Sequence, residues 1–333
     1  MKTYNLNSKE IKICGVNYDG NGNFWRLPKE VAESGANVLG QNHLTVGGRV
    51  RFCTNAPTVN VKITLKEQIV DWAIAISGSA SADVFVGDGE KARWAGIISP
   101  KSYDKNEGEL AIHKSTDFEN VTINLTRNHP ITSMEISVED IYELRAPDPY
   151  TISTPIVFYG SSITAGGCAS SVGSAYTSLV CRWLDADYIN LGFSNGARGE
   201  QPIADYIAGL NMSAFVLDYD HNAYDFELLK ATHEPFFKTI RNAHPNLPVL
   251  ILTRPDFTPE KAKNIERINL IKQTYLNAKA AGDENVYFIS GDTFFEGYDN
   301  GLCTVENCHP NDLGFMLMAK KVYPVLKQML GIE

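Results

Sequence analysis

The sequence contains little cysteine, and its cysteines form neither a disulfide pattern nor a metal-binding pattern. Six cysteines in 333 residues are too sparse for a disulfide scaffold. None of them belongs to a Cys-x-x-Cys pair, which disfavours a structural zinc site. We therefore expect free thiols, no metal ion and a reducing compartment.

Positive charge and long apolar runs are also scarce. The 30 Lys and Arg residues are outnumbered by 39 Asp and Glu residues, which gives a formal net charge of −9. A nucleic-acid partner is disfavoured, because phosphate contacts require a surplus of Lys and Arg. No apolar run approaches the roughly 18–20 residues that span a bilayer, and residues 1–7 lack the apolar core of a signal peptide. These features predict no membrane contact and a cytoplasmic location.

The first part of the chain shows a strand pattern with a period of two. Apolar and polar residues alternate at residues 46–52, 59–65 and 120–125, and turn residues separate such runs. This alternation is typical of half-buried strands. Since no helical pattern interrupts residues 46–143, we predict a β-sandwich of jelly-roll type for residues 1–150.

After a polar stretch at residues 145–150, apolar runs alternate with amphipathic helices. Continuous apolar runs are typical of parallel strands that are covered on both faces. Five such runs are present, at residues 156–159, 188–191, 214–217, 249–252 and 286–289. Their order predicts an α/β domain with a doubly wound, five-stranded parallel sheet over residues 151–333. Ligands of such sheets bind outside the carboxyl ends of the strands, so functional residues should follow these runs directly.

The loop after the first of these strands, residues 160–167, carries the candidate nucleophile Ser162. A serine on a glycine-flanked turn between a strand and a helix has an exposed hydroxyl close to free backbone N–H groups. The loop is not the Gly-x-Ser-x-Gly motif of α/β-hydrolases, because Thr164 stands at the place of the second glycine. Taken alone, it fits a polar strand end without chemistry equally well.

The loop after the second strand, residues 190–200, contains Asn195 and Gly196. Glycines there let the backbone approach a substrate closely and direct an N–H group toward it. A helix-entry loop without function is the simpler interpretation of this segment alone. Arg198 in the same loop, and Arg254 after the fourth strand, either orient a substrate or pair with acidic side chains.

The loop after the third strand allows three interpretations. The amide of Asn222 can donate to a developing oxyanion, a role in which one donor contributes about 10²–10³ in rate. Asp218, Asp220 and His221 suit a divalent cation, although no second histidine or carboxylate at ligand spacing supports a metal site. Capping of the next helix by Asn222 is the third possibility, and His221 is also a candidate substrate contact.

The loop after the fifth strand carries the candidate general base, His309. His309 precedes Pro310, which favours an extended residue before a turn. A histidine fixed there acts as a general base if it reaches Ser162. Glu306 lies three residues earlier, and a turn would bring its carboxylate to the imidazole. Taken alone, His309 fits a surface loop, but together the four loops offer a nucleophile, oxyanion donors and a base with an acidic neighbour.

Over residues 154–330, these loops resemble the four sequence blocks of the SGNH (GDSL-type) hydrolase family. The blocks of that family contribute a serine, a glycine, an asparagine and a histidine. The resemblance implies a flavodoxin-like domain with Ser162 as nucleophile and oxyanion N–H donor, Asn222 as amide donor and His309 as base. A β-sandwich before such a domain is similar to a bacterial subgroup that includes carbohydrate esterases and some acyltransferases.

Two positions depart from the family pattern. The family usually has Asp three residues before the histidine, whereas this chain has Glu306. Its side chain is longer by one methylene, so either the loop adjusts or His309 is oriented by a backbone carbonyl as part of a dyad. The second block usually reads Ser-Gly-Asn, and here it reads Ser194-Asn195-Gly196. The second backbone donor is therefore either Asn195 or Gly196.

These observations predict a serine esterase that needs no cofactor or metal ion. A short acyl group, most simply acetyl, on a carbohydrate is the expected substrate, because no segment resembles a lipid-binding lid. Acyl transfer by the same residues, with an alcohol in place of water, is the first alternative. The second is a carbohydrate-binding protein with an inactive hydrolase domain, in which Trp25, Trp72 and Trp94 stack on sugars, although core packing is the simpler use of these side chains.

Overall fold

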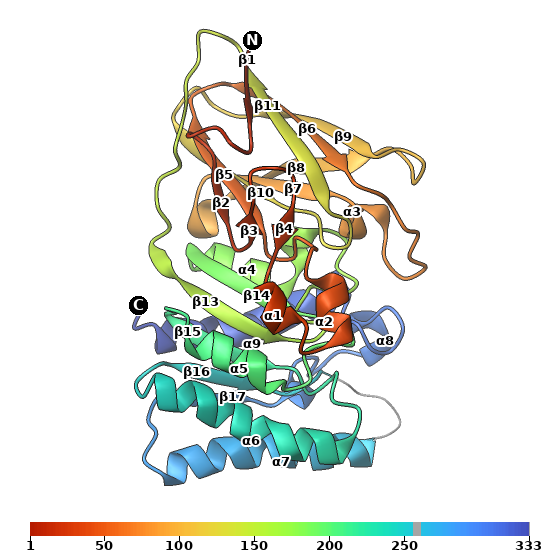
Figure 1. Cartoon of the computed structure of the whole chain (residues 1–333), viewed down its shortest axis with the longest axis vertical. Helices are drawn as coiled ribbons and strands as arrows, with labels where there is room; N and C mark the ends of the chain where they lie inside the picture. Colours follow the sequence, from red (N-terminus) through yellow and green to blue (C-terminus); the bar gives the residue numbers. More distant parts are fainter. Residues whose placement is uncertain (256–260, 333) are drawn as a thin grey trace.

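The computed structural model describes residues 1–255 and 261–332, and it contains an antiparallel sheet followed along the chain by a parallel one (Figure 1). The strand order of the antiparallel sheet is β1-β11-β6-β9-β8-β7-β10-β5-β12, with β2 beside β5. Its strands are β1 (Lys2–Asn5), β2 (Lys12–Cys14), β5 (Arg49–Thr54), β6 (Thr58–Leu65), β7 (Ala82–Val86), β8 (Arg93–Pro100), β9 (Glu107–His113), β10 (Glu119–Asn124), β11 (Ile131–Val138) and β12 (Leu144–Arg145).

This sheet curls into a sandwich, as the alternating pattern predicts. Strand β8 pairs with β7 in one half and with β9 in the other, so it connects the two halves. Side chains such as Val50, Val61 and Ile136 fill the core between the halves. Two short helical segments differ from the prediction and lie within the strand region: a 3-10 helix (Gly89–Lys91) and the helix α3 (Ile76–Ser79). Four residues make about one helical turn, which is too short to leave a period in the sequence.

The second sheet is parallel, with the strand order β14-β13-β15-β16-β17. Its strands are β13 (Ile152–Gly160), β14 (Ala186–Gly192), β15 (Ala214–Asp218), β16 (Val249–Leu252) and β17 (Val286–Ile289). All five contain the apolar runs identified in the sequence. In chain order the sheet reads 2-1-3-4-5, which is the flavodoxin-like order, and the predicted fold class is confirmed.

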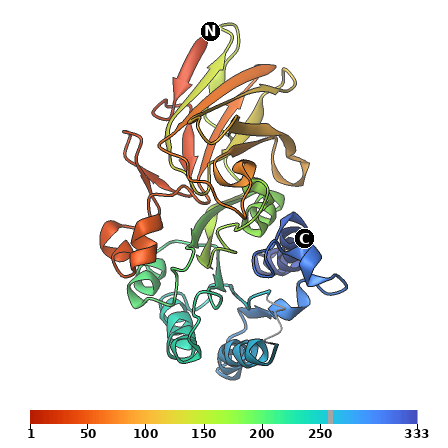
Figure 2. The same ribbon diagram turned by 90° about the vertical axis from the view of Figure 1, so that its right-hand side faces the viewer.

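Helices cover both faces of the parallel sheet (Figure 2). In β13, Val157 and Tyr159 belong to the core on one face, while Ile156 and Phe158 belong to the core on the other. The first face is covered by α5 (Gln201–Ala208), α6 (Phe226–Ala243) and α7 (Lys261–Ala280), and the second by α4 (Tyr176–Trp183) and α9 (Asp312–Met329). None of the helices in the described ranges is both long and apolar enough to cross a membrane.

A segment from the beginning of the chain packs onto the parallel domain. It contains the hairpin of β3 (Asn17–Tyr18) and β4 (Phe24–Trp25), followed by α1 (Lys29–Ala32) and α2 (Ala36–Gln41). Leu27, Ala32 and Val38 belong to the same core as α5 and α6. Figure 2 shows α1 and α2, in orange, beside the green helices of the parallel domain. This segment therefore reaches the edge of the sheet where ligands are expected.

Candidate active site

Ser162 lies in the turn after β13, where the neighbouring residues Gly160 and Ser161 have structural roles. A Cβ atom at Gly160 would lie 2.0 Å from Thr164 Oγ1 and 2.5 Å from the Asp218 carbonyl oxygen, so only glycine fits there. Ser161 Oγ accepts a hydrogen bond from the Ile163 N–H at 3.1 Å. Since Ser161 is buried and occupied in this way, Ser162 is the serine of the turn that is available for chemistry.

Asp218, at the end of β15, stabilises this turn through hydrogen bonds. Its Oδ2 accepts hydrogen bonds from Tyr176 at 2.7 Å and from Thr164 at 2.9 Å. Burial raises the pKa of Asp218 to about 7, because the interior disfavours the charged form. Thr164 stands where the α/β-hydrolase motif has its second glycine. Its buried hydroxyl connects the turn to β15 and does not face substrate.

Ser162, His309 and Glu306 form a continuous chain of hydrogen bonds. Ser162 Oγ lies 2.7 Å from His309 Nε2, and His309 Nδ1 lies 2.6 Å from Glu306 Oε1. The three side chains are partly buried, with 29% of the His309 side chain and 22% of the Glu306 side chain exposed. The order of hydroxyl, imidazole and carboxylate is the one that can activate a serine.

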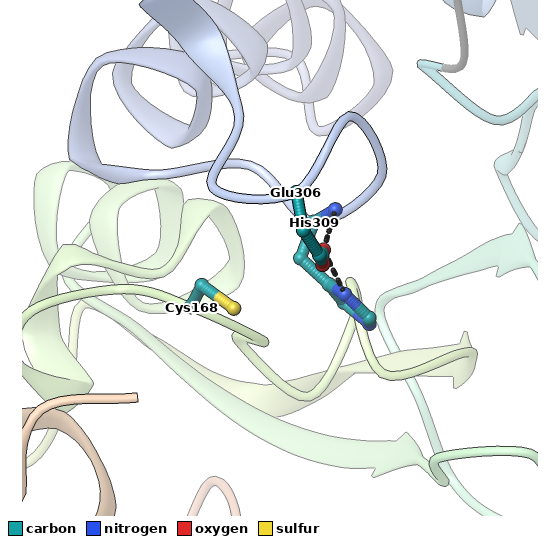
Figure 3. Close-up of side chains that lie close together, drawn as sticks. All are labelled: Cys168, Glu306 and His309. Carbon is teal, nitrogen blue, oxygen red and sulfur yellow. Dashed lines mark hydrogen bonds and ion pairs between the residues drawn. The ribbon is translucent and has the colours of Figure 1, made fainter. Parts of the chain in front are cut away.

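The loop before α9 brings the Glu306 carboxylate to both the backbone and the ring of His309. Asn307 adopts a left-handed conformation with φ of 60°, and the Val305 N–H bonds to the His309 carbonyl oxygen at 3.0 Å across the resulting turn. Glu306 Oε1 can then accept from the backbone N–H of His309 at 2.8 Å as well as from its ring. Figure 3 shows both hydrogen bonds.

The loop after β14 brings Asn195 to the serine. Asn195 has a positive φ of 53° and lines the same cleft as Ser162. Within the described residues, the backbone N–H groups of Ser162 and Asn195 have no hydrogen-bond acceptor, whereas the Gly196 N–H donates to the Phe193 carbonyl at 3.2 Å. Of the two candidates for the second backbone donor, Asn195 is thus the one with an unoccupied N–H group.

Helix α2 holds this loop in place. Gln41 makes two hydrogen bonds with Ser194: its Oε1 accepts from the Ser194 N–H at 2.9 Å, and its Nε2 donates to the Ser194 carbonyl at 2.7 Å. Asn37 Nδ2 donates to the Asn195 carbonyl at 2.8 Å. A segment more than 150 residues earlier in the chain therefore fixes the backbone of Asn195.

Asn222 does not reach the cleft in this structure. Its amide nitrogen donates to the carbonyl oxygens of Phe193 at 2.8 Å and Gly196 at 2.6 Å, which uses both of its N–H groups. The side chain is buried, and among the described residues it is not part of the cleft lining. The expected amide donor thus connects two loops here, because both of its N–H groups bond to the carbonyl oxygens of Phe193 and Gly196.

The cleft around Ser162 has a volume of about 380 Å³ and is formed by both parts of the chain. The parallel domain contributes Ser162, Ala165, Gly167, Cys168, Ser194, Asn195, His221, Tyr224, Glu306, Cys308 and His309. Residues from before the parallel domain are Gln41, Leu44, Val46, Asp71, Trp72, Ala73, Ile74, Arg127 and Asn128. Of this second group only Trp72 was considered from the sequence, as a side chain that could stack on a sugar, because the position of these residues depends on how the two sheets pack.

His221 lies in the cleft, whereas the two candidate arginines do not line it. His221 Nε2 lies 3.2 Å from Cys308 Sγ, and the rings of His221 and His309 are stacked with centroids 6.3 Å apart. Burial, together with the positive charge of Arg254, lowers the pKa of His221 to about 3, so this ring is neutral beside His309. The Arg198 guanidinium carbon lies 5.7 Å from the centroid of the Tyr224 ring, and the backbone N–H of Arg254 donates to Asp220 Oδ2 at 3.2 Å.

One group of side chains in the cleft has the composition of a metal site. Ligand atoms of Cys168, Glu306 and His309 lie within 4.8 Å of one another (Figure 3). Glu306 and His309 are already bonded to each other, and burial and the nearby Glu306 carboxylate raise the pKa of Cys168 to about 11. A protonated thiol is a poor ligand, so the group is better explained by the serine–histidine–carboxylate arrangement. The other set considered from sequence, Asp218, Asp220 and His221, does not converge within the described residues.

A family model of GDSL-like lipases and acylhydrolases matches residues 153–327, more than half of the chain. The chain belongs to this family. A second model, for the N-terminus of SGNH-type esterases, matches residues 1–144. The resemblance inferred from the four loops is thereby confirmed, and the protein is a carboxylic ester hydrolase. A search of curated proteins gave no match.

Several solved structures share the fold of this SGNH hydrolase along its whole length. A GDSL-like lipase from Bacteroides ovatus is 24% identical, with a TM-score of 0.82 and coverage of 100% of this chain and 99% of the other. The salicylyl-acyltransferase SsfX3 of a tetracycline biosynthetic pathway is 21% identical, with a TM-score of 0.78 and coverage of 100% and 99%. A family two carbohydrate esterase from Clostridium thermocellum, solved with cellohexaose, is 14% identical, with a TM-score of 0.64 and coverage of 96% and 99%.

Proposed function

We propose that this hydrolase removes a short acyl group, most simply acetyl, from a carbohydrate ester through Ser162, His309 and Glu306. One observation carries the assignment of these residues. Ser162 Oγ lies 2.7 Å from His309 Nε2, while the opposite ring nitrogen is held by Glu306 at 2.6 Å. The hydroxyl therefore has a base within hydrogen-bond distance, and the base has an orienting carboxylate.

In the acylation step, Ser162 Oγ attacks the ester carbonyl carbon and His309 Nε2 accepts the hydroxyl proton. The Glu306 carboxylate keeps the proton on Nδ1 and stabilises the imidazolium that forms. His309 then gives its proton to the alcohol oxygen as the C–O bond breaks and the alcohol leaves. In the second step, water attacks the acyl-enzyme while His309 accepts its proton, and Ser162 recovers its hydroxyl proton as the acid is released.

The backbone N–H groups of Ser162 and Asn195 are the proposed donors to the oxyanion. Both residues line the cleft, and within the described residues neither N–H has another acceptor. Donors that are fixed before the reaction stabilise the developing negative charge without a cost of reorganisation. The Gln41 and Asn37 hydrogen bonds to the Asn195 loop supply this fixed position.

A carbohydrate ester is supported by the polar side chains that line part of the cleft and by the comparisons. Amide and carboxylate side chains, among them Asp71 and Asn128, line the cleft beside Ser162. Such groups bond sugar hydroxyls and are unfavourable neighbours for a lipid chain. Carbohydrate esterases from Clostridium thermocellum and Butyrivibrio proteoclasticus have the same overall fold.

Acyl transfer to an alcohol is the second candidate, since a salicylyl-acyltransferase shares the fold over the whole chain. The chemistry is the same up to the acyl-enzyme, and the two functions differ in the acceptor. Incubation with an acetyl ester and methyl glucoside separates them: an esterase releases acetate, whereas a transferase forms an acetylated glucoside in excess over acetate.

Labelling with a fluorophosphonate tests the assignment of the nucleophile. We expect one adduct per chain, located on Ser162 by peptide mass spectrometry, and no adduct in Ser162→Ala or after unfolding. The same variant should release no acetate from acetylated glucosides while keeping the wild-type unfolding temperature. An adduct on another serine, or undiminished hydrolysis by Ser162→Ala, would refute the proposed mechanism.

A further inference from the structure

We propose that Trp72 is a platform for the sugar ring of the substrate, at a subsite that the antiparallel domain contributes to the cleft. The inference rests on the proposed esterase function, and it assigns the alcohol part of the ester to a particular wall of the cleft. Trp72 lies in the loop between β6 and α3, which is far from the parallel domain in sequence. Its loop lines the same cleft as Ser162 through Asp71, Trp72, Ala73 and Ile74.

The exposure of Trp72 is the first argument. In the described structure 83% of its surface is exposed, although it borders a cleft. A large apolar side chain in this position gains from being covered, and exposed apolar groups at a cleft are typical of binding sites. The flat C–H face of a pyranose ring matches the face of an indole ring, and stacking removes both surfaces from water.

The loop presents Trp72 in a fixed position. Its first part is attached to the neighbouring loop, where Gln68 Nε2 donates to the carbonyl oxygens of Ser102 and Lys105. Next to Trp72 itself, the Ala73 N–H donates to Asp71 Oδ1 at 2.8 Å and closes a tight turn. A side chain that is positioned before binding loses less entropy when the ligand arrives.

Polar groups beside Trp72 fit the hydroxyls of a sugar. Asp71 Oδ1 is used in the tight turn, and Asn128 Oδ1 accepts from Arg127 Nε at 3.3 Å. Within the described ranges, Asp71 Oδ2 and Asn128 Nδ2 have no hydrogen-bond partner, so the cleft that Trp72 borders offers one acceptor and one donor. This mixture favours a polyhydroxylated ring over an alkyl chain.

A second aromatic residue lines the cleft from the parallel domain. Tyr224 is 62% exposed, and its hydroxyl donates to Asn195 Oδ1 in the oxyanion loop. Tyr224 therefore contacts the loop that carries the proposed oxyanion donor Asn195, whereas Trp72 lies on the side of the cleft that the antiparallel domain forms. This division assigns Trp72 to the alcohol moiety, which extends beyond the reacting carbonyl.

A selectivity measurement tests the proposal. The substrates are ethyl acetate, which has no ring, and the four singly acetylated methyl β-D-glucopyranosides. In Trp72→Ala we expect kcat/KM for the best glucopyranoside, divided by kcat/KM for ethyl acetate, to fall about tenfold, mainly through KM. Trp72→Phe, which keeps a flat ring, should restore most of the ratio. An unchanged ratio in Trp72→Ala overturns the proposal.

Trp94 provides a matched control. It is another tryptophan of the antiparallel domain, 59% exposed on β8, and it does not line the cleft. Trp94→Ala should keep the wild-type ratio, and an equal fall in both variants would overturn the proposal. A change in the native molecular mass of Trp72→Ala in gel filtration would also overturn it, because Trp72 would then serve contact between chains.

Binding of the sugar alone separates this inference from the esterase proposal. Titration of Ser162→Ala with methyl β-D-glucopyranoside should quench tryptophan fluorescence, and the double variant Ser162→Ala/Trp72→Ala should show at least tenfold weaker binding by calorimetry. Such a difference supports the platform even if no acetate is released. Equal binding by both variants overturns the proposed role of Trp72. The esterase proposal is tested separately, by fluorophosphonate labelling of Ser162.

Discussion

Glu306 Oε1 accepts two hydrogen bonds from His309, one from its backbone N–H at 2.8 Å and one from ring Nδ1 at 2.6 Å. The backbone bond fixes the carboxylate, and the carboxylate in turn fixes the ring. Asn307, between the two residues, adopts a left-handed conformation in the turn that brings them together. The replacement of the usual aspartate is therefore compatible with a triad as well as with the dyad considered from sequence.

This geometry predicts that Glu306 contributes strongly to catalysis. We expect Glu306→Ala to lower kcat by on the order of 10³, and His309→Ala to lower it further, because the histidine itself moves the proton. Initial rates on a soluble acetyl ester, normalised to folded protein, measure both effects. A loss of less than about tenfold in Glu306→Ala would favour a dyad in which a backbone carbonyl orients the ring.

The parts of the site that follow strands could be predicted from the sequence. Ser162 and Asn195 lie directly after apolar runs, and His309 lies in the segment between the last strand and α9; parallel strands bring such positions to one edge of the sheet. Trp72 was a candidate for stacking on sugars, but its place in the cleft, like that of Gln41, could not be predicted, because it depends on contacts between segments far apart in the chain. The orientation of Asn222 is set by carbonyls of a neighbouring loop and leaves no trace in its own motif.

Gln41 should act as a positioning residue for the oxyanion loop. Gln41→Ala removes two hydrogen bonds to Ser194, so we expect kcat to fall about tenfold to hundredfold while KM changes little. Steady-state kinetics with ethyl acetate separate the two parameters. Gln273→Ala on the exposed face of α7 is the matched control and should retain wild-type kcat. A rise in KM without a loss of kcat would instead make Gln41 a substrate contact.

Asn222 should affect stability as well as rate. In Asn222→Ala the Gly196 carbonyl loses its amide donor and the Phe193 carbonyl keeps only the Gly196 N–H, so we expect the free energy of unfolding to fall by about 1–3 kcal/mol. Urea denaturation measures this change, and Asn277→Ala on the surface of α7 serves as the control. If Asn222→Ala lowers kcat by about 10²–10³ at unchanged stability, the amide donates to the oxyanion after all.

Asp218 should make the protein less stable as the pH rises toward neutrality. Its pKa is raised from 3.8 to about 7 in the folded protein, chiefly by burial. Between these two values the folded state binds more protons than the unfolded state, so stability falls with increasing pH across this window and the loss is complete above the folded pKa.

The variant Asp218→Asn tests this pH dependence. Its amide oxygen can still accept from Tyr176 and Thr164, but the side chain no longer titrates, so its contribution to the pH dependence of stability disappears. We therefore expect the unfolding temperature of Asp218→Asn to decline less between pH 5 and about pH 8 than that of the wild type. Asp205→Asn, at an exposed position on α5, should decline like the wild type. Parallel curves for wild type and Asp218→Asn would mean that Asp218 is ionised throughout this range.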